Sequence, residues 1–344
     1  MLTIGYSSCD FLDIVPDEIT TEADAFKDRN AAKNFVYSCY GYLPQSNVAS
    51  GSLDLLTGDE VITAFEHETF ASFPKGNYTA SSPVISYWNT FFQGLRQCYI
   101  FLENVDKVPD LTESVKTDYI AQVKFLIAYY HYQLARCYGP IILIKELPDV
   151  NASQAEYLPR TSYDECVDWI CNLLDEAASS LPAIRTNKED YGLATSVGAK
   201  AVKAKMLLYA ASPLFNGNSS FYSNFTDKSG SQLMPLTYDP NKWVKAKTAI
   251  KEAIDLAEQN GHALYVKQDY KIGNEDANPY PAAGPVRCLR TSLVDWDSRN
   301  PEVLLAETRS EGSYGIQNKS LPFVTDGWAW NGVGPTWTML NRFY

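Results

Sequence analysis

The amino-acid sequence predicts a mainly α protein, built of tetratricopeptide-like helical hairpins and an irregular, loop-rich region. One long segment, Gln122 to Ile144, has apolar residues at helical spacing on more than one side. Other segments repeat this spacing between helix-capping and helix-breaking signals. From about Tyr265 onward the periodicity gives way to glycine, proline, asparagine and aromatic residues, which are typical of loops.

The 122–144 segment is expected to be the central helix of the scaffold. A helix that is apolar on more than one side normally lies between other helices. Gly139-Pro140 should end it, because Gly permits a left-handed turn and Pro cannot continue the hydrogen-bond ladder. His131 lies within the helix, where a buried histidine with satisfied hydrogen bonds is the expected state.

Two helices are expected before the central one. The first should begin at an N-cap on Thr20 or Thr21 and end near Tyr40, and the second should run from Val84 to Val108. Residues 45–83 between them read as a loop with Asp59-Glu60, for which we expect a bracing role. A loop of this length is usually functional or disordered, and its aromatic residues argue against disorder.

Three further helices are expected after the central one, at Tyr163–Leu181, Thr195–Ala211 and about 240–258. The first and third resemble each other: each follows a proline-containing turn and ends in an acidic, alanine-containing turn. Small residues that allow close helix approach recur in the third, as in tetratricopeptide-type repeats: Ala246, Ala249, Ala253 and Ala257. A strand-like segment, Glu302–Glu307, interrupts the loops that follow.

Composition excludes several classes of function. The 344 residues carry a net charge of −12, which argues against nucleic acid as a partner. No apolar run approaches the roughly 20 residues that span a bilayer. The seven cysteines form no zinc-binding pattern, so we expect no metal, no cofactor and no structural disulfide, and we interpret most cysteines as small buried hydrophobic residues.

Cys9 differs from the other cysteines because small residues precede it near the start of the chain. Residues 1–20 are interpreted as the remnant of a bacterial lipoprotein signal followed by an extended segment, with Cys9 as the lipidation site. The segment has no basic region and only a short apolar run, so an incidental thiol is the alternative.

Several segments together resemble the SusD/RagB family of outer-membrane nutrient-binding lipoproteins. They occur in the family's order: Ser8–Pro16, Asp59-Glu60, Tyr87–Asn104, Ala121–Pro140, Leu181-Pro182, Ala210–Gly217, and the Trp243 helix with Asn300–Glu307 after it. The chain departs from the family at Ile127, where an Arg is usual. Members are also longer, so the resemblance implies that the C-terminal part of the family fold is missing after Tyr344.

The resemblance implies a single domain over residues 21–344, with a helical scaffold at about 21–261 and a loop-rich region at about 262–344. The loops would bind a glycan at the cell surface, and the protein would be anchored to the outer membrane by a lipid on Cys9. The partner would be a TonB-dependent, SusC-like transporter that imports the oligosaccharide.

Sugar rings bind flat aromatic faces, and their hydroxyl groups bind amides and carboxylates. The strongest candidates lie in one glycine-containing loop: Trp328, Trp330, Asp326 and Asn331. Further candidates are Trp296, Tyr314, Tyr78 and Phe73. For Trp88, Trp169 and Trp243, which lie on helix faces, a place in the core is expected instead.

No catalytic residues are assigned, because the three histidines are scattered and no nucleophile or phosphate-loop motif is present. The sequence therefore predicts a non-enzymatic glycan-binding protein. Two alternatives stay open: a RagB-like protein that binds peptides, and a helical-barrel glycoside hydrolase, whose carboxylate pair would be recognised only in space.

Overall fold

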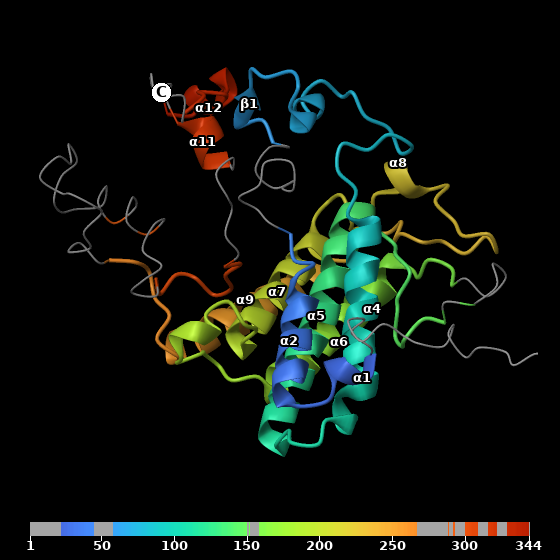
Figure 1. The fold of residues 1–344 in the computed structure, drawn as a ribbon. Coiled ribbons are helices and arrows are strands. Elements are labelled where there is room, and N and C mark those ends of the chain that lie inside the picture. Colours follow the sequence, from blue (N-terminus) through green and yellow to red (C-terminus); the bar gives the residue numbers. More distant parts are fainter. Residues whose placement is uncertain are drawn as a thin grey trace, which may run out of the picture.

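The computed structural model describes residues 22–44, 58–149, 151, 158–266, 288, 292, 300–308, 316–321 and 329–343 (Figure 1). The helices are α1 (Glu22–Ala25), α2 (Arg29–Tyr40), α4 (Trp88–Asn104), α5 (Glu113–Tyr138), α6 (Tyr163–Ser180), α7 (Ser196–Ala211), α8 (Ser219–Tyr222), α9 (Asn241–Gln259), α11 (Ile316–Ser320) and α12 (Trp337–Leu340). Two strands are described, β1 (Val61–Thr63) and β2 (Val333–Pro335).

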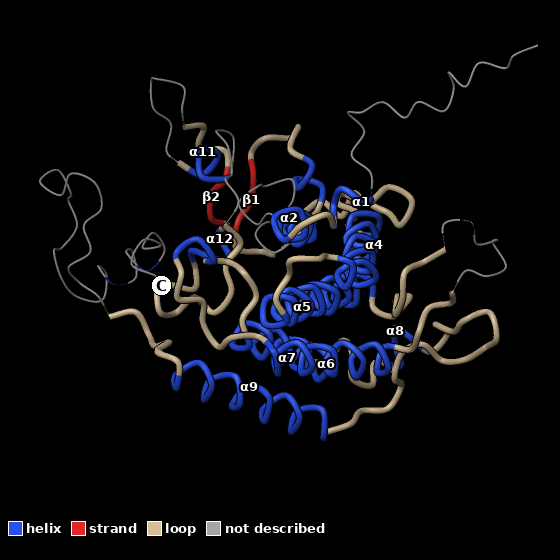
Figure 2. The backbone as a smooth tube through the Cα atoms, turned by 60° about the horizontal axis from the view of Figure 1, so that its bottom comes forward, coloured by secondary structure: helices blue, strands red, loops and turns tan. Residues whose placement is uncertain are grey.

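The central position predicted for the 122–144 segment is confirmed, because α5 is buried on several sides along its length. It packs against α4 and α2 and against α6 and α7, while α9 packs on α7 as the outermost helix (Figure 2). The largest fully buried side chains include Tyr130 of α5 and Phe91 of α4, whose rings stack at 5.6 Å. Each such side chain contributes roughly 1.5–3 kcal/mol through burial.

His131 in α5 is a structural residue, as the sequence predicts. Its Nδ1 donates to the carbonyl of Ile127 at 2.8 Å, and its Nε2 accepts from the backbone N–H of Ile144 at 3.1 Å. The second bond ties the segment after α5 back onto the helix. Burial lowers the pKa of His131 to about 4, so the imidazole is neutral.

The end of α5 is held in two ways. Gly139 ends the helix with φ of 70° and ψ of −123°, a positive-φ conformation outside the left-handed helical region that glycine adopts readily. The Arg160 guanidinium donates to the carbonyls of Tyr138 and Pro140 and lies over the Trp88 ring, 5.1 Å from its centroid. The arginine therefore joins the carboxyl end of α5 to the first turn of α4.

A polar network joins α2, α5 and the loop after α6. Arg185 makes a bidentate ion pair with Asp118 and also donates to the carbonyl of Ala194. The Asp118 carboxylate accepts from Gln122, which in turn accepts from the Tyr40 hydroxyl. The network closes because the N–H of Ala194 donates to that same hydroxyl at 2.9 Å.

The alanine stripe of α9 is buried against α7, which confirms the expected close approach of the two helices. Lys200 and Lys203 of α7 both bind Asp175 of α6. Burial alone would raise the pKa of Asp175, but the hydrogen bonds from the two lysines outweigh it and lower that pKa. These contacts make α6, α7 and α9 one continuous layer.

Three details of the prediction are wrong. The first helix is broken after Ala25, and Asp28, which accepts from the N–H groups of Asn30 and Ala31, caps the helix that follows. Glu302–Glu307 forms turns and irregular backbone, because it packs against Gly192 and Gly198 rather than beside a strand. Trp243 is 41% exposed and so does not lie in the core.

Among the described residues, no helix is both long and apolar enough to cross a membrane.

Candidate functional site

Two segments that are far apart in the chain meet in a short antiparallel ribbon. Strand β1 pairs with β2 so that Val61 faces Pro335 and Thr63 faces Val333. In Figure 1 the ribbon lies with α11 and α12, outside the layer of long helices. We call the described parts of residues 58–83 and 316–343 the joined module. The ribbon joins the loop before α4 to the C-terminal segment.

Contacts on both sides of the ribbon hold the joined module together. Thr336 donates through its N–H to the carbonyl of Glu60 at 3.0 Å and through its hydroxyl to the carbonyl of Asp59. Asp59 and Glu60 thus hold the ribbon through backbone carbonyls. Lys319 of α11 forms an ion pair with Glu68, and both side chains are largely buried. The loop is therefore bound to the C-terminal segment by charge as well as by backbone pairing.

Gly332 is needed where the two segments approach most closely. A Cβ atom built on it would lie 2.0 Å from the Phe65 ring, so a larger side chain cannot be placed without moving that ring. The backbone N–H of Ala64 donates to the carbonyl of Gly332 at the same point. The glycine therefore permits the aromatic ring to pack over the ribbon.

Four candidate residues lie in the joined module. Trp330 is half-buried, and its backbone N–H donates to the carbonyl of Asn318 at 3.1 Å. Asn331 is exposed with φ of 48°, a conformation that asparagine tolerates better than most residues, and its N–H donates to Leu321. Tyr78 is 51% exposed and its ring lies 5.3 Å from that of Phe73.

The structure adds two aromatic residues that the sequence analysis did not assign. Trp337 and Phe343 are 80% and 75% exposed, in or next to α12. The aromatic residues that cluster over 337–344 are the feature of the sequence that could have indicated them.

Five residues singled out in the sequence lie outside the described residues: Cys9, Trp296, Tyr314, Asp326 and Trp328.

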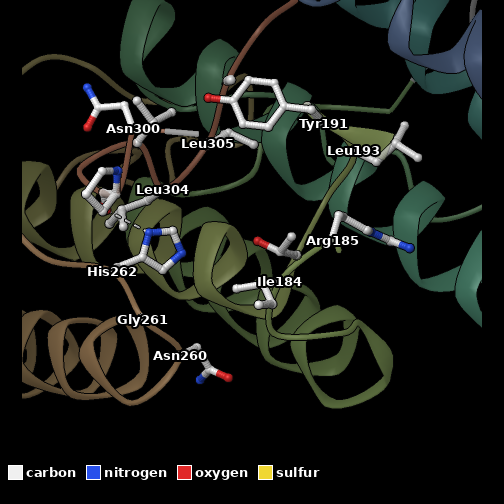
Figure 3. Close-up of a pocket in the computed structure, with 15 residues that line it drawn as sticks. Ile184, Arg185, Tyr191, Leu193, Asn260, Gly261, His262, Asn300, Leu304 and Leu305 are labelled. Atoms are coloured by element: carbon white, nitrogen blue, oxygen red, sulfur yellow. Dashed lines mark hydrogen bonds between the residues drawn. The ribbon is translucent and has the colours of Figure 1, made fainter. Parts of the chain in front are cut away.

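A pocket of about 180 Å³ lies elsewhere, between the loop after α6, the end of α9 and residues 300–306 (Figure 3). His262 lies among its walls, with Nδ1 donating to the carbonyl of Pro301 at 2.9 Å. A 150 Å³ cavity holds one benzene molecule, whereas drug-sized ligands occupy roughly 300–1,000 Å³. The pocket is thus suited to one ring-sized group and is too small for an oligosaccharide.

The joined module can bind a ligand through aromatic faces, an exposed amide and nearby hydroxyl groups. In the part of the chain that the structure describes, no group of three or more His, Cys, Asp or Glu side chains is placed to hold a metal ion. The module's exposed aromatic side chains have flat apolar faces, and its exposed polar groups include both amides and charged side chains such as Glu66 and Lys75.

The chain is similar to known proteins in sequence and in fold. A family profile for SusD-like proteins, described as "Starch-binding associating with outer membrane", matches residues 10–208. No curated protein sequence matches the chain. Among solved structures, the protein BT4246 is 30% identical, with a TM-score of 0.76 over 92% of this chain and 57% of its own.

Two Bacteroides fragilis NCTC 9343 proteins share the fold at lower identity. The SusD-like protein BF3747 is 20% identical, with a TM-score of 0.66 over 91% of this chain and 52% of its own. The SusD-like carbohydrate-binding protein BF0978 is 18% identical, with a TM-score of 0.53 over 71% of this chain and 43% of its own. This chain therefore spans little more than half the length of the first structures that it matches.

Proposed function

We propose a glycan-binding function for this chain, which belongs to the SusD-like family of starch-binding proteins associated with the outer membrane. The ligand would be a neutral oligosaccharide or polysaccharide bound on the joined module. The observation that supports the proposal is the β1–β2 ribbon, because it joins the segment that carries Phe73 and Tyr78 to the segment that carries Trp330 and Asn331.

The proposed mechanism is capture by stacking. The apolar face of a sugar ring would lie on an exposed aromatic face, such as that of Tyr78, and lose water there. The side-chain amide of Asn331 and the tyrosine hydroxyl would bind the sugar hydroxyl groups. The candidates Asp326, Trp328, Trp296 and Tyr314 would extend this surface.

In the proposed setting, lipidated Cys9 anchors the protein to the cell surface, and the helical side docks on a TonB-dependent, SusC-like transporter. The protein would act as a lid that passes bound oligosaccharide to the transporter. Binding and release require no covalent chemistry, so we propose that the protein is not an enzyme. Family membership supports this setting, and the exposed aromatic side chains support the glycan ligand.

Affinity gel electrophoresis against a panel of neutral polysaccharides tests the function. We expect at least one polysaccharide to slow the wild-type protein, and release of reducing sugar in the same samples to stay at background. If no polysaccharide slows it while calorimetry detects binding of a peptide mixture, the ligand is a peptide. Release of reducing sugar would show instead that the protein is a glycoside hydrolase.

A further inference from the structure

Helices α2 and α4 lie side by side and run in opposite directions, as three contacts along them show. Gln97 donates to the hydroxyl of Ser38 at 3.0 Å. On one side of this contact the rings of Phe35 and Phe101 lie 6.2 Å apart. On the other side a Cβ atom on Gly94 would lie 3.0 Å from the Cβ of Tyr42, just past the end of α2. The two helices therefore approach closely over this length.

Cys39 and Cys98 face each other in the middle of these contacts. The register of these contacts sets Cys39 of α2 beside Cys98 of α4, and both residues are 0% exposed. The other buried cysteines have different neighbours: the Cys166 thiol points at the carbonyls of Ile141 and Thr161, and Cys171 lies near Lys203 and Asp175. Cysteines at matching positions of two closely packed helices are placed to form a disulfide.

Although the sequence predicts no structural disulfide and the structure holds both residues as free thiols, we propose that Cys39 and Cys98 form a disulfide that joins α2 to α4 when the protein folds in an oxidising compartment. The compartment follows from the proposed surface location, since exported proteins keep their disulfides. A disulfide-bonded oxidant of that compartment would accept the two electrons. The two cysteine thiols lose their protons, one S–S bond forms between them, and the oxidant is reduced to two thiols.

The bond would form before α2 and α4 are fully packed. Burial raises the pKa of the Cys98 thiol, which disfavours the thiolate needed for exchange in the folded protein. During folding the thiols are still exposed and react readily. After folding the same burial protects the bond from reductants, so the disulfide is structural.

The disulfide has a consequence for the joined module. Residues 41–87 leave from the end of α2 and return at the start of α4, and they include β1, Phe73 and Tyr78. A Cys39–Cys98 bond would close this segment covalently at its base. The cross-link also removes conformational freedom from the unfolded chain, which stabilises the folded protein. The loop proposed to bind glycan would thus be tied at both ends.

Peptide mapping tests the proposal directly. The chain is exported into an oxidising periplasm, purified without reductant, denatured with an alkylating agent and digested with trypsin. Cleavage at lysine and arginine places Cys39 alone in peptide 34–75 and Cys98 alone in peptide 97–107. We expect these peptides to be linked, at the summed mass less two hydrogen atoms. Both peptides alkylated, or either one linked to another cysteine, would overturn the proposal.

Thermal unfolding supplies the second measurement. Reduction after unfolding and refolding should lower the melting temperature by roughly 5–10 °C, which is the effect of losing one long cross-link. Cys98→Ala should remove the difference between oxidised and reduced samples, whereas the matched control Cys171→Ala should keep it. Glycan binding is not used in either measurement, so their outcome is independent of the proposed function.

Discussion

Single residues in the scaffold have roles that follow from burial and hydrogen bonding. His131 lies in the core and forms a hydrogen bond with each of its two ring nitrogens. Its role could be predicted from the sequence because it lies at an inward position of the most apolar helix. Its partner, the backbone of Ile144, could not be predicted, since that contact depends on how the chain folds back after Pro140.

Stability should fall as the pH falls through the titration range of His131. The ordinary pKa of 6.5 applies to the unfolded chain, whereas burial lowers the folded value to about 4. Between these values the unfolded state binds more protons, so the free energy of unfolding should decrease by about 3 kcal/mol over this range. Urea denaturation at several pH values measures this decrease in the free energy of unfolding.

The comparison needs a variant without the histidine, because carboxyl groups titrate in the same range. His131→Gln should be less stable than wild type at neutral pH, and the difference between the two should shrink toward pH 4. A difference that stays constant from pH 7 to pH 4 would contradict this account of His131.

Arg185 should contribute more to stability than exposed charged residues do. Its side chain is 12% exposed and holds Asp118 and the carbonyl of Ala194 together. Arg185→Ala would leave a partly buried carboxylate without its cation, at a cost of about 2–4 kcal/mol. Urea denaturation measures this, with Lys251→Ala as the control, since Lys251 forms an exposed ion pair with Asp255. Equal effects in both variants would contradict the assigned role.

At the scale of elements, the helices were predictable and the ribbon was not. The carboxyl end of α5 and both ends of α6, α7 and α9 agree with the predicted ends to within a few residues, because capping residues, glycine and proline act locally. Strands β1 and β2 have three residues each and lie far apart in the chain, so no local pattern indicates their pairing. The apolar pattern of Glu302–Glu307 predicts a strand, but the segment packs against Gly192 and Gly198 and has no partner strand among the described residues.

The ribbon supplies a test of whether the two segments act together. Gly332→Ala should push the Phe65 ring away and disturb the joined module, weakening glycan binding about tenfold or more, while the helical circular dichroism signal stays unchanged. Gly334→Ala is the matched control on the same strand, because a Cβ atom there meets nothing within 4 Å. Calorimetric titration with the glycan that the wild type binds measures the affinity of both variants. Equal affinity in the two variants would show that the packing of Phe65 on the ribbon does not affect glycan binding.

At the scale of the whole molecule, the scaffold and the binding surface differ in how far sequence predicts them. Trp330, Asn331, Tyr78 and Phe73 were chosen because they are aromatic or polar residues in loops, and the structure places all four in the joined module. What sequence could not provide is the joining of the two segments that carry them, which depends on backbone pairing over a long distance. The exposure of Trp243 and Trp337 likewise depends on the final packing.

The central claim is that the joined module binds glycan through aromatic residues from both of its segments. Calorimetric titration of the double variant Tyr78→Ala/Trp330→Ala, with the polysaccharide that the wild type binds, tests it most directly. Trp243→Ala is the control, because it removes an exposed tryptophan from α9. We predict at least a tenfold loss of affinity in the double variant and none in the control, since each stacked ring contributes about 1 kcal/mol or more. Unchanged affinity in the double variant would contradict the account.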